Sequence, residues 1–203
     1  MNRLIILFCL LLTGCAGANS VNSDYHGEDA GVLVVSEGTT ASPFTFMLHY
    51  RIAGEAPAGV YGEGDGIISY TGGGLFADTP DFSDPEKGRV TIQHLKPGTY
   101  EIYDYEIYNG NVRFSPTKYF SIQFTIRPNQ TTYIGHFQGT IRTQDTHFLG
   151  LQIALQRYFV VTDTQDRDVK IARKKEPNLP PVVNSVPDVS KIGLPEFRAT
   201  EIP

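Results

Sequence analysis

The chain has no tryptophan and only two cysteines, Cys9 and Cys15, both near its start. Beyond Cys15 there is no thiol, which excludes an internal disulfide and a cysteine nucleophile from the rest of the chain. Long hydrophobic runs are also lacking. The apolar run from Leu4 to Leu12 is too short to span a bilayer as a permanent helix.

An excess of basic residues is likewise absent, because 17 Lys and Arg face 22 Asp and Glu. This balance argues against a nucleic-acid partner, which requires a basic face. The chain also lacks the G-x-S-x-G, H-E-x-x-H and P-loop patterns. We therefore predict neither an enzyme nor a cofactor.

The first residues carry a targeting signal. Arg3 precedes the apolar run, which ends in Leu12-Thr13-Gly14-Cys15. These small residues before a cysteine resemble the lipobox of bacterial lipoproteins. The resemblance implies that residues 1–14 are a signal peptide, that the chain is cut after Gly14, and that Cys15 is acylated on its sulfur and on its new amino terminus. The alternatives are an ordinary secretory signal that contains a cysteine, and a short membrane anchor.

Lipidation would give Cys15 a role that pairing cannot, since Cys9 leaves with the signal. Each buried methylene contributes about 0.8 kcal/mol, so two or three acyl chains hold a protein on a membrane essentially permanently. Cys15 is followed by Ala16 and not by Asp. In lipoproteins of double-membraned bacteria this implies the outer membrane, with the protein facing the periplasm. Loss of Arg3 leaves 16 basic against 22 acidic side chains, a net charge of −6.

Residues 15–30 are small and polar, which predicts a lipidated flexible tether. A β domain then follows over residues 31–162, where apolar residues alternate with polar ones. The predicted strands are 31–36, 44–52, 66–70, 90–92, 100–108, 120–126, 131–139 and 149–161. About eight strands with short turns and no long helix predict a mainly β fold, an antiparallel β-sandwich.

The segment Leu95-Lys-Pro-Gly-Thr-Tyr100 resembles the hairpin entry of transthyretin-like, or prealbumin-like, sandwiches. Pro97 fixes φ at the first central position of the turn, and Gly98 accepts a positive φ at the second. The resemblance implies a transthyretin-like sandwich and says nothing about an activity.

Tyrosines crowd the next strand. Tyr100 and Ile102 share one parity and Tyr103 and Tyr105 the other, which predicts a bulge or register change at Ile102-Tyr103. Two roles remain open for Tyr103 and Tyr105. Packing in the core or across strands is the preferred one, and a surface for a protein partner is the other.

After the domain, residues 163–176 predict a short helix with Thr162 or Asp163 as its N-cap. Acidic residues open this helix and basic residues close it, which complements the helix dipole. The basic end could touch anionic lipid, although a solvated helix end is preferred. Residues 177–203 contain six prolines, which predicts an extended or partly disordered tail.

Two functions remain open. The preferred one is a non-enzymatic binding or structural module of the cell envelope, held on the membrane by its acyl chains and bound to an envelope protein. The alternative is an envelope metal- or carbohydrate-binding protein or hydrolase, with a site near His49, His136 and the Asp78–Glu86 loop. For that loop a solvated, turn-rich segment is preferred. The alternative predicts that these residues converge in space.

Overall fold

The strands follow the two-residue alternation of the sequence. The computed structural model describes residues 25–41, 43–54, 65–75, 77–110, 112–145 and 152–200. In β7 (Ile122–Ile126) the three apolar side chains are buried, while Gln123 and Thr125 between them are exposed. Successive side chains of a strand point to opposite faces, so the alternation turns one face of β7 toward the core.

The first sheet, sheet A, has the strand order β11-β9-β8-β1-β4, and β10 also pairs with β8. Its strands are β1 (Gly31–Thr39), β4 (Lys87–Leu95), β8 (Thr131–Asp145), β9 (Gln152–Thr162), β10 (Val182–Asn184) and β11 (Phe197–Arg198). The pairs β1–β8, β10–β8 and β11–β9 are parallel. The prediction of a purely antiparallel fold is therefore wrong for sheet A. The chain visits sheet B between β1 and β8, a crossover long enough for parallel pairing.

The second sheet, sheet B, is antiparallel throughout the described residues and has the order β3-β2-β5-β6, with β7 also paired to β5. Its other strands are β2 (Thr45–Ile52), β3 (Gly66–Thr71), β5 (Gly98–Tyr108) and β6 (Arg113–Phe114). Across the described residues there are eleven strands where the sequence predicts about eight, and β6, β10 and β11 are the short additional ones.

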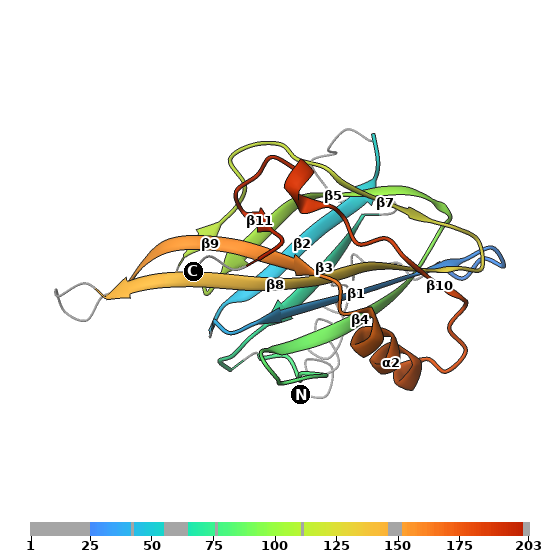
Figure 1. The fold of residues 1–203 in the computed structure, drawn as a ribbon, viewed down its shortest axis with the longest axis horizontal. Coiled ribbons are helices and arrows are strands. Elements are labelled where there is room, and N and C mark those ends of the chain that lie inside the picture. Colours follow the sequence, from blue (N-terminus) through green and yellow to red (C-terminus); the bar gives the residue numbers. More distant parts are fainter. Residues whose placement is uncertain are drawn as a thin grey trace, which may run out of the picture.

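Both sheets contribute side chains to one hydrophobic core. Phe46 of sheet B meets Phe159 of sheet A edge to face, with ring centroids 5.8 Å apart. Leu33 and Val35 of β1 belong to the same cluster and are fully buried. The prediction of a mainly β fold is confirmed, and Figure 1 shows the two sheets as neighbouring layers.

The Pro97-Gly98 turn connects β4 of sheet A to β5 of sheet B. These strands do not pair with each other, so the prediction of a hairpin entry is wrong. The expected positive φ at Gly98 is also wrong, because Gly98 is the first residue of β5 and pairs with Ile126. The turn carries the chain from one layer to the other.

A β-bulge in β5 reconciles the two tyrosine parities. His49 of β2 faces Asp104, but its neighbour Tyr50 faces Ile102, which leaves Tyr103 without a position in the register. Ile102 and Tyr105 both point into the core as a result, and both are fully buried. The predicted register change at Ile102-Tyr103 is confirmed, since one extra residue in a strand reverses the facing of those that follow.

Helix α2 (Gln165–Lys175) lies against β1 and β4 on the side of sheet A that faces away from sheet B (Figure 1). Ala172 packs there on Val32 and Val34 in a second apolar cluster. The N-cap is Thr164, and not Thr162 or Asp163 as predicted. β9 runs on to Thr162, so the helix begins later than the charge pattern indicates.

The segment after α2 is extended but packed. It adds β10 to β8, forms the short 3-10 helix η1 (Val189–Lys191), and then adds β11 to β9 (Figure 1). Phe197 of β11 is 3% exposed and stacks on Phe159 at 5.4 Å. Of the two conformations predicted for this tail, the described residues 177–200 have the extended one, and apolar residues spaced between the prolines enter the core.

Candidate functional site

Seven polar side chains meet between α2 and the outer face of sheet A, and we call them the buried polar cluster. They are Ser36, Glu86, Tyr133, His136, Thr164, Arg167 and Asp168. Ser36 and Asp168 are completely buried, and His136 is 3% exposed. Burying a polar group lowers the stability of the fold unless the group is hydrogen-bonded or paired with an opposite charge. The partners of each member therefore show what the cluster does.

A bulge in β8 brings two members of the cluster to the same face. Val34 of β1 pairs with Tyr133, but Ser36 pairs with His136, so β8 has one extra residue in between. Gly135 lies in this bulge at a φ of 106°, a conformation that glycine adopts without strain. Tyr133 and His136 therefore both point outward beneath α2, next to Ser36.

Asp168 is the centre of the cluster. Its Oδ2 accepts hydrogen bonds from the hydroxyls of Ser36 (2.6 Å), Tyr133 (2.8 Å) and Thr164 (2.8 Å). Its Oδ1 accepts one from Nε of Arg167 at 2.8 Å. Burial, followed by the charge of Asp168, raises the pKa of Tyr133 well above its ordinary value, so Tyr133 stays a donor. Four donors thus satisfy one buried carboxylate.

His136 connects the two carboxylates of the cluster. Its Nδ1 lies 2.8 Å from Oγ of Ser36. Its Nε2 lies 3.0 Å from Oε1 of Glu86, but the angle is outside the range of a hydrogen bond. Ser36 donates its only proton to Asp168, so Nδ1 is the donor to Ser36. Both ring nitrogens of His136 face oxygens. Arg167 lies 3.5 Å from Glu86 and also pairs with Asp168, so one guanidinium contacts both carboxylates.

The electrostatics of Glu86 agree with this pairing. The contact with His136 lowers the pKa of Glu86 and outweighs burial, which raises it; the charge of Arg167 lowers it further. A serine, a histidine and carboxylates are the residue types of a hydrolase. Here, however, Ser36 is completely buried and hydrogen-bonded to Asp168. The arrangement therefore stabilises α2 on sheet A and does not prepare a nucleophile.

A second polar group lies on the outer face of sheet B. Arg51 donates to Oε1 of Glu101 at 2.9 Å, while Tyr119 (3.0 Å) and Ser121 (2.5 Å) donate to Oε2. Burial pushes the pKa of Glu101 upward, but these hydrogen bonds outweigh it and the pKa is lowered. The guanidinium of Arg51 also lies 4.2 Å from the centre of the Tyr103 ring.

The two tyrosines predicted as alternatives between core and partner surface have different positions. Tyr103, the bulge residue, is half-buried on the outer face of sheet B, above Arg51. Tyr105 is completely buried and contacts Phe159 and Phe197 in the core. The partner-surface role is therefore wrong for Tyr105, because the bulge turns its side chain inward. Tyr119, which no sequence pattern marks, is 71% exposed on this face.

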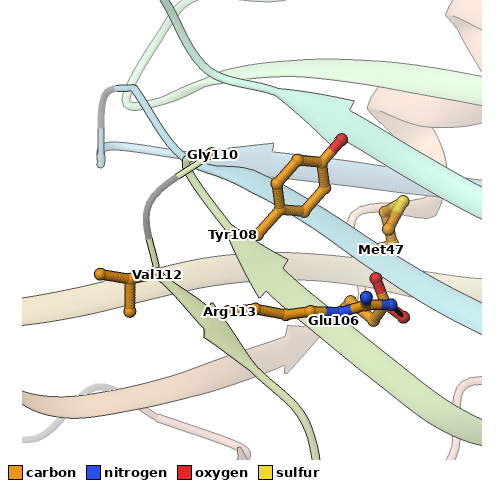
Figure 2. A pocket seen from close by; sticks show the side chains of 6 residues that line it. All are labelled: Met47, Glu106, Tyr108, Gly110, Val112 and Arg113. Carbon is orange, nitrogen blue, oxygen red and sulfur yellow. Dashed lines mark hydrogen bonds and ion pairs between the residues drawn. The ribbon is translucent and has the colours of Figure 1, made fainter.

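A hollow of about 410 Å³ opens at the end of β5 and β6. Its lining residues are Met47, Glu106, Tyr108, Gly110, Val112 and Arg113, and Figure 2 shows the Tyr108 ring and Met47 on one side of the Glu106–Arg113 pair. Small-molecule sites have volumes of this order. Val112 is 43% exposed at the edge of the hollow, so it is open to a partner.

The residues proposed for a metal site do not converge. His49 lies on the outer face of sheet B, 3.9 Å from Glu106, and burial lowers its pKa. His136 lies on the outer face of sheet A, so the hydrophobic core separates the two rings. Only His136 and Glu86 meet as the alternative predicts. Within the described residues no group of three or more His, Cys, Asp and Glu side chains forms a metal-binding cluster.

The loop carboxylates instead bind protein groups. Asp78 accepts a hydrogen bond from the backbone N–H of Thr71 at 2.7 Å. Asp81 accepts one from the backbone N–H of Val90 at 2.7 Å and pairs with Lys175 at the end of α2. These bonds fold the segment between β3 and β4 onto its neighbours, so Asp78 and Asp81 are structural residues.

Cys15, the predicted lipid-attachment residue, lies outside the described residues, as does most of the predicted tether. Among the helices of the described residues, none has the length and apolar character that a membrane span requires. No family matches the chain, and no curated protein or solved structure is significantly similar to it.

Proposed function

We propose that this protein is a bacterial lipoprotein, anchored to the envelope membrane by acyl chains on Cys15, and that it is a non-enzymatic binding module. The support for the anchor is the sequence Leu12-Thr13-Gly14-Cys15 after a short apolar run. Ala16 favours the outer membrane, with the domain in the periplasm. The two sheets and their shared core support a β-sandwich body.

The proposed partner surface is the outer face of sheet B around Tyr103 and Tyr119, together with the hollow beside Tyr108. The observation that carries it is an exposed ring held in place. Tyr119 is 71% exposed, yet its hydroxyl donates to Glu101, which Arg51 holds in turn. A ring that is already ordered loses little conformational entropy on binding, which is how tyrosines serve many protein interfaces.

A photo-crosslinking amino acid at Tyr119 in living cells tests this surface. We expect a discrete adduct with one envelope protein, and no adduct when the same amino acid replaces Asp166, which is exposed on α2 at the other side of the molecule. The expected adduct should disappear when Tyr103 is also replaced by Ser. Identical adducts from positions 119 and 166, or none from position 119, would reject the proposed surface.

A further inference from the structure

The last two turns of α2 present a row of basic side chains to the solvent. Lys170, Arg173 and Lys174 are exposed and spaced i, i+3 and i+4, so they share one face of the helix. The opposite face carries the buried residues Val169 and Ala172. We call the three exposed residues the basic face of α2.

The basic face is not used inside the described part of the chain. The ion pairs of α2 there are made by two other cations. Arg167 pairs with Glu86 and Asp168, and Lys175 pairs with Asp81. A row of cations without internal partners, on a chain with an acidic balance overall, indicates an anionic partner outside the protein.

The chain enters the fold beside this end of α2. The backbone N–H of Tyr25, the first described residue, donates to the carbonyl of His94 at 2.9 Å. Nε2 of His94 lies 3.1 Å from Glu176, the C-cap residue of α2. Nine residues lie between Cys15 and Tyr25, and a fully extended segment of these ten residue steps reaches at most about 35 Å. An anchor at Cys15 therefore holds this end of the molecule close to its membrane.

We propose that the basic face of α2 docks on the anionic, phosphate-bearing lipid head groups of the membrane that holds the anchor. This inference rests on the proposed anchor at Cys15. An anionic surface attracts Lys170, Arg173 and Lys174. It repels Glu28 and Asp29 beside Tyr25, but the three cations outnumber these two carboxylates. The docked orientation turns the outer face of sheet B, on the opposite side of the core, away from the membrane and toward a partner.

Energy transfer from a single dye to labelled lipid measures this orientation. After processing, the acylated chain has no free thiol. Asn178→Cys therefore gives one labelling site just after α2, and Lys118→Cys gives one on the sheet B side, next to Tyr119.

The labelled, acylated proteins are reconstituted into phosphatidylcholine vesicles with and without phosphatidylglycerol. We expect the dye at position 178 to approach the surface only when phosphatidylglycerol is present, and high salt to reverse the effect. The dye at position 118 should move away.

The charge-reversal variant R173E/K174E should abolish the approach of the dye at position 178. Each basic side chain near an anionic surface contributes about fivefold, so the preference for the docked orientation should fall at least about 30-fold. The matched variant K87E/K118E changes the net charge by the same amount, at two exposed lysines outside α2. It should leave the orientation unchanged.

Two failures are distinguishable. If mass spectrometry shows that Cys15 is not acylated, and the protein stays with neither kind of vesicle in high salt, the proposed anchor fails. If the protein is acylated and stays with both kinds, but the dye at position 178 reports the same distance in each, the anchor stands and the docking of α2 is overturned. An equal effect of R173E/K174E and K87E/K118E would also overturn it, since net charge alone would then explain the result.

Discussion

At the scale of single residues, Asp168 is the side chain on which the attachment of α2 most depends. It is completely buried and accepts hydrogen bonds from Ser36, Tyr133, Thr164 and Arg167. Removing the carboxylate leaves Arg167 with an unbalanced charge and buried hydroxyls without their acceptor. Buried charged partners lost in this way cost far more than exposed ones.

We therefore expect Asp168→Ala to lower the free energy of unfolding by about 3–5 kcal/mol. The exposed Asp166 lies on the same helix, and Asp166→Ala should change it by less than about 0.5 kcal/mol. Urea denaturation followed by circular dichroism measures both. Equal effects of the two substitutions would contradict a structural role for the buried polar cluster.

Glu37 of β1 should make the protein less stable as pH rises. Its side chain is 2% exposed, and neither carboxyl oxygen has a hydrogen-bond partner within the described residues. Burial, with the charge of Asp78, raises the pKa of Glu37 well above its ordinary value of 4.5, although Arg89 opposes this. Above pH 4.5 the unfolded chain releases the proton while the folded chain retains it, so unfolding is favoured until the folded pKa is reached.

The substitution Glu37→Gln should remove this pH dependence of the free energy of unfolding, because glutamine does not ionise. The stability of the wild type should fall relative to the variant by up to about 1.4 kcal/mol per pH unit between pH 4.5 and the folded pKa. Below pH 4.5 the difference between the two proteins should be constant. Denaturation midpoints measured at several pH values test this, and two parallel stability curves would show that Glu37 ionises normally in the folded protein.

Glu86 should have the opposite effect, because its pKa is lowered by His136 in the folded protein. Its contribution to stability is present above the unfolded value of 4.5 and is lost as pH falls through the folded pKa. Glu86→Gln should accordingly have a lower free energy of unfolding than the wild type at neutral pH. The difference between the two proteins should become smaller in acid. Urea denaturation at several pH values measures this difference. A difference in unfolding free energy that stays constant as the pH is lowered would mean that ionisation of Glu86 beside His136 does not contribute to stability.

At the scale of elements, the packed segment after α2 is the feature that sequence composition conceals. Phe197 of β11 lies with its ring centroid 6.0 Å from Tyr105 of sheet B and 5.4 Å from Phe159 of sheet A, so it joins the two sheets at one end of the core. We expect Phe197→Ala to cost about 3–5 kcal/mol. Val183→Ala in β10, where the side chain is 37% exposed, should cost much less. Limited proteolysis should cut the Phe197 variant near its C terminus first, and resistance equal to the wild type would contradict this role.

Strands were predictable from local pattern, and contacts between distant segments were not. In β7 and β2 the alternation of apolar and polar residues marks the buried face directly, and the parity change at Tyr103 marked the bulge in β5. The parallel pairing of β1 with β8 leaves no local mark, since it depends on how the chain crosses between the two sheets.

For the same reason the buried polar cluster was predicted only in part, since the alternative site included His136 and Glu86 but not Ser36 or Asp168. Ser36, Glu86, His136 and Asp168 come from separate parts of the chain, and each one alone resembles a solvated polar residue. His136 lies at a polar position of the alternating strand pattern, which predicts a side chain that faces solvent. In the structure this side chain faces α2 instead. One local signal was present, because Asp168 precedes Val169 and Ala172 on the buried stripe of the helix. A carboxylate on the apolar side of a helix requires buried donors.

At the scale of the whole molecule, the proposed anchor and the two-sheet body should be separable. The first strand begins at Gly31, sixteen positions after Cys15. Cys15→Ser removes the only sulfur that the lipobox places at the processed N terminus. We expect this variant to leave the membrane fraction in an alkaline carbonate wash. Its unfolding midpoint should match that of the acylated protein in detergent, because acyl chains anchor the chain without entering the core.

Cys9→Ser is the matched control for this experiment. It also exchanges one sulfur for one hydroxyl, but Cys9 lies within the apolar run of the predicted signal, which is removed during processing. This variant should stay in the membrane fraction through the carbonate wash, with the same mature mass as the wild type. If Cys15→Ser also stays in the membrane fraction, the protein is held by something other than acyl chains. Release of both variants would instead show that export, and not acylation, had been disturbed.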